Sequence, residues 1–190
     1  MWSVILISIM RLFQKIRVLF YKLISVKMIN KGKIYQPVLA QGLGEITIGK
    51  NLLGYPNSPY FYSGYNYLDA RCKGPSITIG NNTQINNNFV IIAEKSHIKI
   101  GDHVLIGTDF CVYDSDFHDI RINKRQSTEH ICKPVEIMNN VFIGSKVTIL
   151  KGVKIGENAV IANGSIVTKD IPANQLWGGI PAKKITDLST

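Results

Sequence analysis

The chain has 190 residues, which is the length of one domain with at most a short appendage. Apolar residues make up 45% of it and charged residues only 18%, a composition that excludes wholesale disorder. The net charge is +9, but residues 1–33 hold seven basic residues and no acid, so the rest of the chain carries only +2 and does not predict nucleic-acid binding.

The three cysteines, Cys72, Cys111 and Cys132, are far apart in the sequence. Their number is odd and no two form a CxxC pair, so the sequence predicts neither a disulfide framework nor a cysteine-based zinc site. Unpaired thiols favour a reducing compartment, and we expect a cytoplasmic location.

Residues 1–33 are predicted to form a basic amphipathic helix. Residues 2–10 are almost wholly apolar, and apolar side chains then recur at steps of four and three, which places them on one helical face. These side chains are Ile5, Ile9, Leu12, Ile16, Leu19, Leu23 and Val26. Arg11, Lys15 and Lys22 fall together on the flank of that face.

Such a helix is typical of an interfacial membrane anchor, with apolar side chains at the headgroup boundary and basic ones near anionic lipid. A spanning helix needs about 20 predominantly apolar residues, whereas five basic residues lie between positions 11 and 27. A cleaved signal peptide is not expected, because the first residues are not basic and no small-residue cleavage site follows. We therefore expect a peripheral membrane contact. Packing on the protein's own body, or bundling with neighbouring subunits, is the alternative.

Residues 52–76 hold five of the eight tyrosines, together with Phe61. The five are Tyr55, Tyr60, Tyr62, Tyr65 and Tyr67. Aromatic faces stack on sugar rings and on one another. Packing against the N-terminal helix or the first strands is the favoured interpretation, and binding of an acceptor sugar is the alternative.

A six-residue period dominates the rest of the chain. The aliphatic positions are Ile79, Ile85 and Ile91, then Ile100, Ile106 and Val112, then Ile137, Ile143, Ile149, Ile155, Ile161 and Val167. A period of six fits neither a 3.6-residue helix nor a hairpin ladder, but it fits a short strand followed by a tight corner. Three such units close a triangular coil, whose inward side chains stack on those of the next coil.

The sequence thus predicts an all-β solenoid over residues 34–186, followed by a tail at 187–190. Glycine and asparagine at the corners, such as Gly80, tolerate a positive φ. Residues 52–76 and 113–133 break the six-residue rhythm and are predicted to be insertions.

The C-terminal stretch PVEIMNNVFIGSKVTILKGVKIGENAVIANGSIVTKDIPANQLWGGIPAKKI carries a resemblance to a known family. It resembles the hexapeptide-repeat acyltransferases, in particular the maltose/galactoside O-acetyltransferase branch and bacterial surface-polysaccharide O-acetyltransferases. The resemblance covers about residues 40–186. It implies a left-handed parallel β-helix and a homotrimer that binds acetyl-CoA between neighbouring subunits. The left hand comes from the resemblance alone, since general rules favour right-handed crossovers.

Residues 113–133 contain Asp114, Asp116 and His118. Acyl transfer from a thioester to a sugar hydroxyl needs a base, and histidine titrates in the right range. The family places its catalytic histidine in such a loop, and His118 matches that motif. Asp116 or Asp114 is expected to orient the ring, with solvated loop acids or substrate contacts as the alternative.

Acids beside a histidine also permit a metal site, but no metal is expected, because ester formation on CoA needs none. His103, at a Gly-Asp-His corner, is predicted to be a turn residue.

The resemblance also places the coenzyme and acceptor contacts. Acetyl-CoA contacts are expected at Gly144, Ser145, Asn163, Thr168, Lys169 and Lys183. Lys169 and Lys183 would meet the phosphates as point charges, and backbone N–H groups near Gly144 and Ser145 are candidates for stabilising the tetrahedral oxyanion. Asn87 falls where relatives contact the acceptor, and a corner asparagine ladder is the alternative.

Together these features predict an acetyl-CoA-dependent O-acetyltransferase. Its expected acceptor is a sugar hydroxyl of a bacterial surface polysaccharide (O-antigen or capsule) or of its precursor, and His118 is the expected general base in a direct transfer. Two alternatives stay open: an N-acetyltransferase of an amino-sugar nucleotide or small amine, and a non-catalytic β-helix scaffold. The expected location is cytoplasmic, with the N-terminal helix on the inner face of the cytoplasmic membrane.

Overall fold

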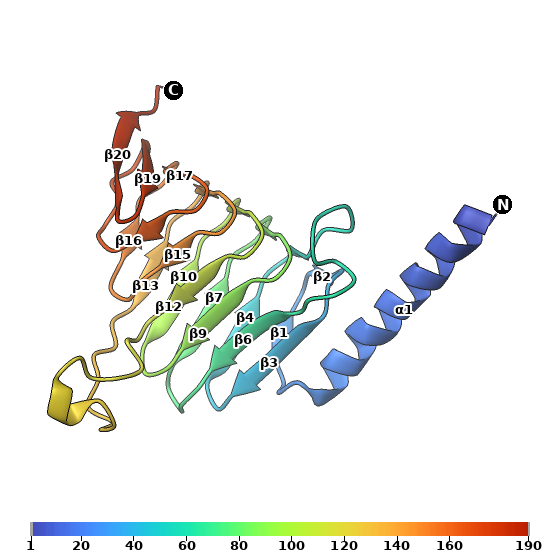
Figure 1. Ribbon diagram of the computed structural model, residues 1–190, viewed down its shortest axis with the longest axis horizontal. Helices are drawn as coiled ribbons and strands as arrows, with labels where there is room; N and C mark the ends of the chain where they lie inside the picture. The colour runs from blue at the N-terminus through green and yellow to red at the C-terminus, as the bar shows by residue number, and fades with distance from the viewer. Residues whose placement is uncertain (1, 190) are drawn as a thin grey trace.

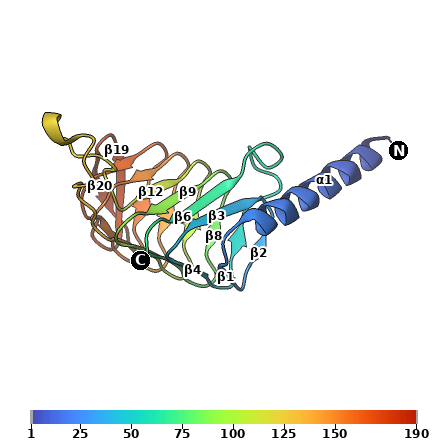
Figure 2. The same ribbon diagram turned by 90° about the horizontal axis from the view of Figure 1, so that it is seen from below.

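The chain forms a stack of triangular coils, and a helix extends away from the first coil (Figures 1 and 2). The computed structural model describes residues 2–189, with side chains from residue 5 onward. Three sheets, here called A, B and C, form the three sides of the stack. Sheet A consists of β1 (Ile29–Asn30), β4 (Glu45–Ile48), β7 (Ser76–Ile79), β10 (His97–Ile100), β13 (Val135–Ile137) and β16 (Lys154–Ile155). Sheet B consists of β2 (Lys33–Ile34), β5 (Leu52–Leu53), β8 (Gln84–Ile85), β11 (Leu105–Ile106), β14 (Phe142–Ile143), β17 (Val160–Ile161), β19 (Gln175–Gly179) and β20 (Ala182–Asp187). Sheet C consists of β3 (Val38–Gly42), β6 (Asn66–Ala70), β9 (Val90–Ala93), β12 (Cys111–Tyr113), β15 (Thr148–Ile149) and β18 (Ile166–Val167).

The core is a set of aliphatic stacks that run along the inside of the coils. In sheet A, Ile48, Ile79, Ile100, Ile137 and Ile155 pair in succession from one strand to the next. Each is at most 1% exposed. Burial of one such side chain contributes about 1.5–3 kcal/mol to the free energy of folding. The predicted six-residue stack and the parallel β-helix are confirmed.

The corners between sheets use residues that accept the left-handed backbone region. His103 has a φ of 58°, which confirms that it is a turn residue, and Asn82 and Asn140 each have a φ of 55° at equivalent corners. At Gly80 a Cβ would lie 2.7 Å from the Gly101 carbonyl oxygen. Only glycine therefore fits this close passage of one corner over the next.

The C-terminal end of the stack is closed by a hairpin. Strand β19 adds to β17 in parallel and β20 returns antiparallel to it. The hairpin covers the last coil, as a solenoid end requires. Because β20 runs to Asp187, the last strand ends one residue beyond the predicted 34–186 boundary, and Thr190 of the predicted tail lies outside the described residues.

The N-terminal helix α1 is shorter than predicted. It covers Trp2–Ile24, and the prediction of a helix over residues 1–33 is wrong at its C-terminal end. The Ser25 hydroxyl donates to the Tyr21 carbonyl oxygen (2.7 Å), and the Val26 N–H donates to Ala40 of β3 (2.9 Å). Pairing with the β-helix thus overrides local helix propensity. Strand β1 and the first residue of β2, Lys33, lie within the segment that was predicted to be helical.

The first insertion is also shorter than the predicted 52–76. Leu52–Leu53 pairs with β2 and β8, and β6 pairs with β3 and β9, so only residues 54–65 leave the coil. The backbone of this loop packs on α1: Gln14, which is buried, donates to the Phe61 carbonyl oxygen (2.6 Å). The rings of Tyr21 and Tyr65 lie 5.1 Å apart. The predicted packing against the helix is confirmed.

Candidate active site

The second insertion begins where β12 ends and carries His118. Its stem is closed by the Lys133 N–H, which donates to the Asp114 carbonyl oxygen (2.8 Å), and by an antiparallel bridge between Ser115 and Cys132. Tyr113 still belongs to β12, so the loop leaves the coil one residue later than predicted. In Figures 1 and 2 this yellow segment projects from the coils at the end opposite to α1.

The His118 ring is exposed and is oriented by a main-chain carbonyl group. Its Nδ1 lies 3.0 Å from the Arg125 carbonyl oxygen on the far side of the loop. A carbonyl oxygen can only accept, so this contact selects the tautomer with the proton on Nδ1 and leaves Nε2 as a hydrogen-bond acceptor. The ring opens onto a hollow of about 570 Å³ that Asp116, Asp119 and Arg125 also line.

The loop acids are held by basic side chains rather than by the histidine. Asp116 accepts from Lys151 Nζ at 2.5 Å, which ties the loop to the corner after β15. Arg121 forms a fork on the Asp119 carboxylate, and this hydrogen bonding lowers the pKa of Asp119 to about 2. These acids fix the shape of the loop around the hollow.

Asp114 has a different role from the one predicted. It is fully buried, and its carboxylate accepts from the backbone N–H groups of Glu94 (2.7 Å), Lys95 (3.0 Å) and Ser96 (2.7 Å). Neither Asp114 nor Asp116 hydrogen-bonds to His118 in the described part of the chain. The prediction that one of them orients the ring is corrected: the Arg125 carbonyl group does so, and nothing in the residue type of Arg125 signals this.

The predicted coenzyme residues at the corner between sheets B and C form a ladder. Ser145 N–H donates to Asn163 Oδ1 (2.8 Å), and Thr108 N–H points to Ser145 Oγ (3.2 Å). A Cβ on Gly144 would lie 2.7 Å from the backbone N of Asn163, so this corner admits only glycine. The Gly144 N–H also donates a hydrogen bond, to the Ile161 carbonyl oxygen (2.9 Å). The backbone N–H groups of Gly144 and Ser145 are therefore not available for an oxyanion, which corrects that prediction.

The other predicted coenzyme residues lie elsewhere. Thr168 and Lys169 are exposed at the opposite edge of sheet C, directly after β18, on the same side as the His118 loop. Lys183 is exposed on β20. Neither lysine has an ion-pair partner among residues 5–189. One chain thus presents its candidate residues at two separate corners and does not gather them into one pocket.

Asn87 does not present polar atoms to an acceptor. It is fully buried. Its Oδ1 accepts from Tyr55 N–H (2.8 Å), and its Nδ2 faces the carbonyl oxygens of Tyr55 (3.0 Å), Ser58 (3.3 Å) and Pro59 (2.8 Å). The predicted substrate contact is corrected: Asn87 holds the 54–65 loop against the coil, and it is not part of a corner ladder either.

A cluster at the base of the His118 loop was not predicted, and it is partly buried. Glu94 accepts from Ser115 Oγ (2.5 Å), and His130 Nε2 lies 2.9 Å from Glu94 Oε2. Together with Cys132 these side chains form the one described group of metal-ligand type. A histidine and a cysteine two positions apart, at the end of an insertion, were the only signal in the sequence.

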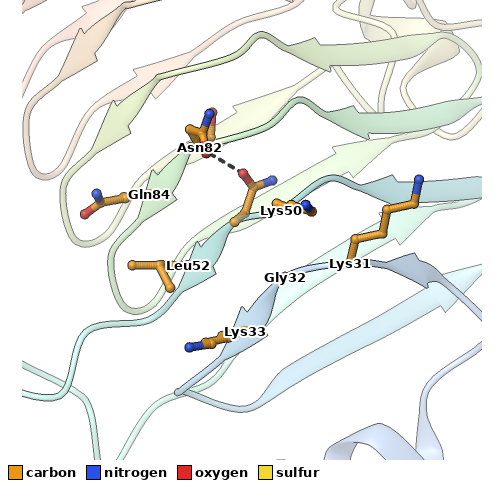
Figure 3. Close-up of a pocket in the computed structure, with 9 residues that line it drawn as sticks. Lys31, Gly32, Lys33, Lys50, Leu52, Asn82 and Gln84 are labelled. Atoms are coloured by element: carbon orange, nitrogen blue, oxygen red, sulfur yellow. Dashed lines mark hydrogen bonds between the residues drawn. The ribbon is translucent and has the colours of Figure 1, made fainter.

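A second hollow, of about 390 Å³, lies at the corner between sheets A and B in the first coils. Lys31, Lys33 and Lys50 line it, and Figure 3 shows the side chains of Lys31 and Lys33 extending in different directions. The lysines make this end of the molecule basic but do not converge on one point. Among the described residues, no helix has the length and apolar character needed to cross a membrane.

Comparison with known proteins identifies relatives of this chain. The family model of the bacterial transferase hexapeptide (six repeats) matches residues 134–169. The galactoside O-acetyltransferase of Escherichia coli (strain K12) is 37% identical over 143 residues, which are 75% of this chain and 64% of that protein. This chain spans 59–64% of the length of the first three curated relatives.

Solved structures of acetyltransferases are similar to this chain as well. A hexapeptide-repeat-containing acetyltransferase from Vibrio cholerae O1 biovar eltor, complexed with acetyl coenzyme A, is 42% identical with a TM-score of 0.57, over 60% of this chain and 61% of that one. The polySia-specific acetyltransferase is 31% identical with a TM-score of 0.59, over 81% of this chain and 70% of that one.

The stacked coils with a histidine-bearing loop at one corner define a left-handed parallel β-helix of the transferase type. Within that class, the chain belongs to the hexapeptide-repeat transferase family.

Proposed function

We propose that this protein transfers an acetyl group from acetyl-CoA to a sugar hydroxyl of a surface polysaccharide or its precursor. The observation that carries the proposal is His118, whose Nδ1 is held on a backbone carbonyl group and whose side chain lines an open hollow. Relatives named for O-acetylation of galactosides and of polysialic acid support the reaction class.

In the proposed step, His118 Nε2 takes the proton of the acceptor hydroxyl as its oxygen attacks the thioester carbonyl carbon. The C–S bond then breaks, and the CoA thiolate takes the proton from the imidazolium. The Arg125 carbonyl group keeps the ring in the required tautomer throughout. No covalent acyl-enzyme is needed.

The active unit is proposed to be a homotrimer. Two features support this: the candidate residues lie at two separate corners of sheet C, and the tip of the His118 loop exposes Ile120 (84%) and Ile122 (85%) to solvent. A neighbouring copy would bring its Gly144–Asn163 corner against this loop and cover the isoleucines. Light scattering of wild type should give a trimer mass. Ile122→Asp should lower that mass, and Ile185→Asp, an exposed apolar site on β20, is the matched control.

The helix α1 is proposed to rest on an anionic membrane surface. Its large apolar side chains are exposed along most of its length, from Ile5 (48%) to Leu23 (74%), and Arg11, Lys15 and Lys22 are exposed among them. It has no acidic residue. Leu12→Glu with Leu23→Glu should abolish sedimentation with phosphatidylglycerol vesicles, whereas Leu43→Glu, equally exposed on a coil, should not. Equal vesicle binding by both variants would contradict the anchor.

The reaction is tested by an acceptor panel with detection of free CoA thiol. Galactosides, sialic-acid oligomers, sugar nucleotides and lipid-linked sugars are incubated with acetyl-CoA and the full chain. A hydroxylamine-labile product identifies an ester and supports O-acetylation. A stable product identifies an amide and would favour the N-acetyltransferase alternative. If none of these acceptors supports release of the CoA thiol, the non-catalytic scaffold is the favoured alternative.

A further inference from the structure

The base of the His118 loop holds three potential metal ligands, of which Glu94 is buried and Cys132 is half-buried. Glu94 directly follows β9, whereas His130 and Cys132 lie on the returning stem of the loop. The His130 side chain is 5% exposed and the Glu94 side chain 11%. The carboxylate oxygen, the imidazole nitrogen and the thiol sulfur all lie within 4.8 Å of one another.

The His130 ring makes a close contact with Glu94 but no well-formed hydrogen bond within the described residues. Both Nδ1 and Nε2 are buried, and neither makes a hydrogen bond of acceptable geometry within the described residues, although Nε2 lies 2.9 Å from Glu94 Oε2. Nδ1 has no polar partner in the described part of the chain, and a buried ring nitrogen without one carries a desolvation cost. A metal ion coordinated by the ring would give one of these nitrogens a partner.

The surrounding charge favours a cation at the same point. Glu94 and Asp114 are both buried acids, and Asp114 is already satisfied by three backbone N–H groups. The Arg71 guanidinium is 3.9 Å from Glu94, but it is engaged at 3.0 Å by Asp69. A buried acid is costly unless it is paired or bound to a metal, and Glu94 shares Arg71 with Asp69, so its charge is open to a bound cation.

We propose that Glu94, His130 and Cys132 bind a zinc ion that fastens the His118 loop to the coil. The mixed nitrogen, sulfur and oxygen donor set suits Zn²⁺, whereas calcium and magnesium take oxygen ligands. A water molecule would complete the tetrahedron. On binding, the Cys132 thiol and the imidazole each lose any proton they carry at the donor atom, and the protons leave to solvent.

The site is structural and does not depend on the proposed acetyl transfer. It sits where the two stems of the loop meet, at the Ser115–Cys132 bridge, and Cys132 is fourteen residues beyond His118. The ion would hold the returning stem against β9 and so limit the movement of the segment between the stems. It also departs from the expectation, drawn from the chemistry of the reaction, that no metal is present.

The test uses the full chain stripped with a chelator and reloaded. Wild type should retain about one zinc ion per chain after desalting, and Co²⁺ in its place should give a thiolate-to-metal charge-transfer band. Cys132→Ser and His130→Gln should each weaken zinc binding at least about tenfold. Cys72→Ser and His97→Gln, which alter a cysteine and a histidine outside the cluster, should not.

Zinc should also slow alkylation of Cys132 but not of Cys72 in wild type, which keeps the test valid if a variant fails to fold. Two results would overturn the proposal: wild type that retains no zinc above the level of Cys132→Ser, or alkylation of Cys132 at the same rate with and without zinc. In either case Glu94, His130 and Cys132 do not form a metal site.

Discussion

Replacing Asn87 by alanine separates a structural role for this residue from a substrate contact. The side chain makes four contacts with the backbone of residues 55–59, at 2.8–3.3 Å, and it is fully buried. The two amide protons serve three carbonyl oxygens, so about three effective hydrogen bonds are lost. At about 1 kcal/mol each, with one donor and several acceptors left buried, the free energy of unfolding should fall by roughly 2–4 kcal/mol.

For a chain of this size the loss corresponds to a decrease in Tm of roughly 5–15 °C. The assay is thermal unfolding followed by circular dichroism, together with limited proteolysis of the 54–65 loop. Asn57→Ala, on the exposed side of the same loop, is the matched control and should leave Tm unchanged. If Asn87→Ala unfolds at the wild-type temperature and resists protease equally, the residue does not hold the loop, and the acceptor contact becomes the better explanation.

Three further predictions concern the helix, the core and the His118 loop. Gln14→Ala with Arg17→Ala removes the hydrogen bonds from α1 to the carbonyl oxygens of the 54–65 loop. Amide hydrogen exchange in α1 should therefore accelerate, while exchange in β7 stays constant. Unchanged exchange in α1 would mean that apolar contacts alone hold the helix. Ile149→Ala should lower the free energy of unfolding by about 2–5 kcal/mol, measured by urea denaturation, because the side chain is fully buried between coils; a loss below about 1 kcal/mol would contradict its place in the stack. The Arg121 guanidinium lowers the pKa of Asp119 to about 2. Their pairing therefore stabilises the loop above pH 4, and this stabilisation is lost as the pH falls from about 4 to 2. An NMR titration of the Asp119 carboxyl carbon with a midpoint near pH 4 would refute the pair.

The coil architecture was predictable because its signal is local and repeated. One aliphatic residue every sixth position, as from Ile137 to Val167, leaves few alternatives to stacked strands and corners, and the register confirms the stack. His103 was predictable for the same reason, since its place in the repeat is a corner.

The boundaries were less predictable because the short strands are stabilised from other coils. Leu52 and Leu53 form a strand only because β2 and β8 lie on either side, so the segment resembled part of an insertion. The helix ends at Ile24 because Val26 pairs with Ala40, which is fourteen residues further on.

The polar site residues depended on contacts between distant segments. Asp114 lies near His118 in the sequence, but its carboxylate is used by backbone amides some twenty residues earlier. Asn87 is similarly engaged by a loop about thirty residues before it. His130 had no supporting neighbour in the sequence, and Glu94 reaches it only through the fold. Residue type and spacing thus identified the loop but not the role of each polar residue in it.

The central claim is that the Nε2 of His118 accepts the proton of the acceptor. It is tested most directly by comparing wild type, His118→Ala and His97→Ala in thiol release with a competent acceptor, together with calorimetric binding of CoA. We predict that His118→Ala lowers kcat by roughly 10²–10⁴-fold, the usual contribution of a general base, while CoA binding and the rate of His97→Ala stay close to wild type. A His118→Ala variant that transfers acetyl groups at the wild-type rate would contradict the account.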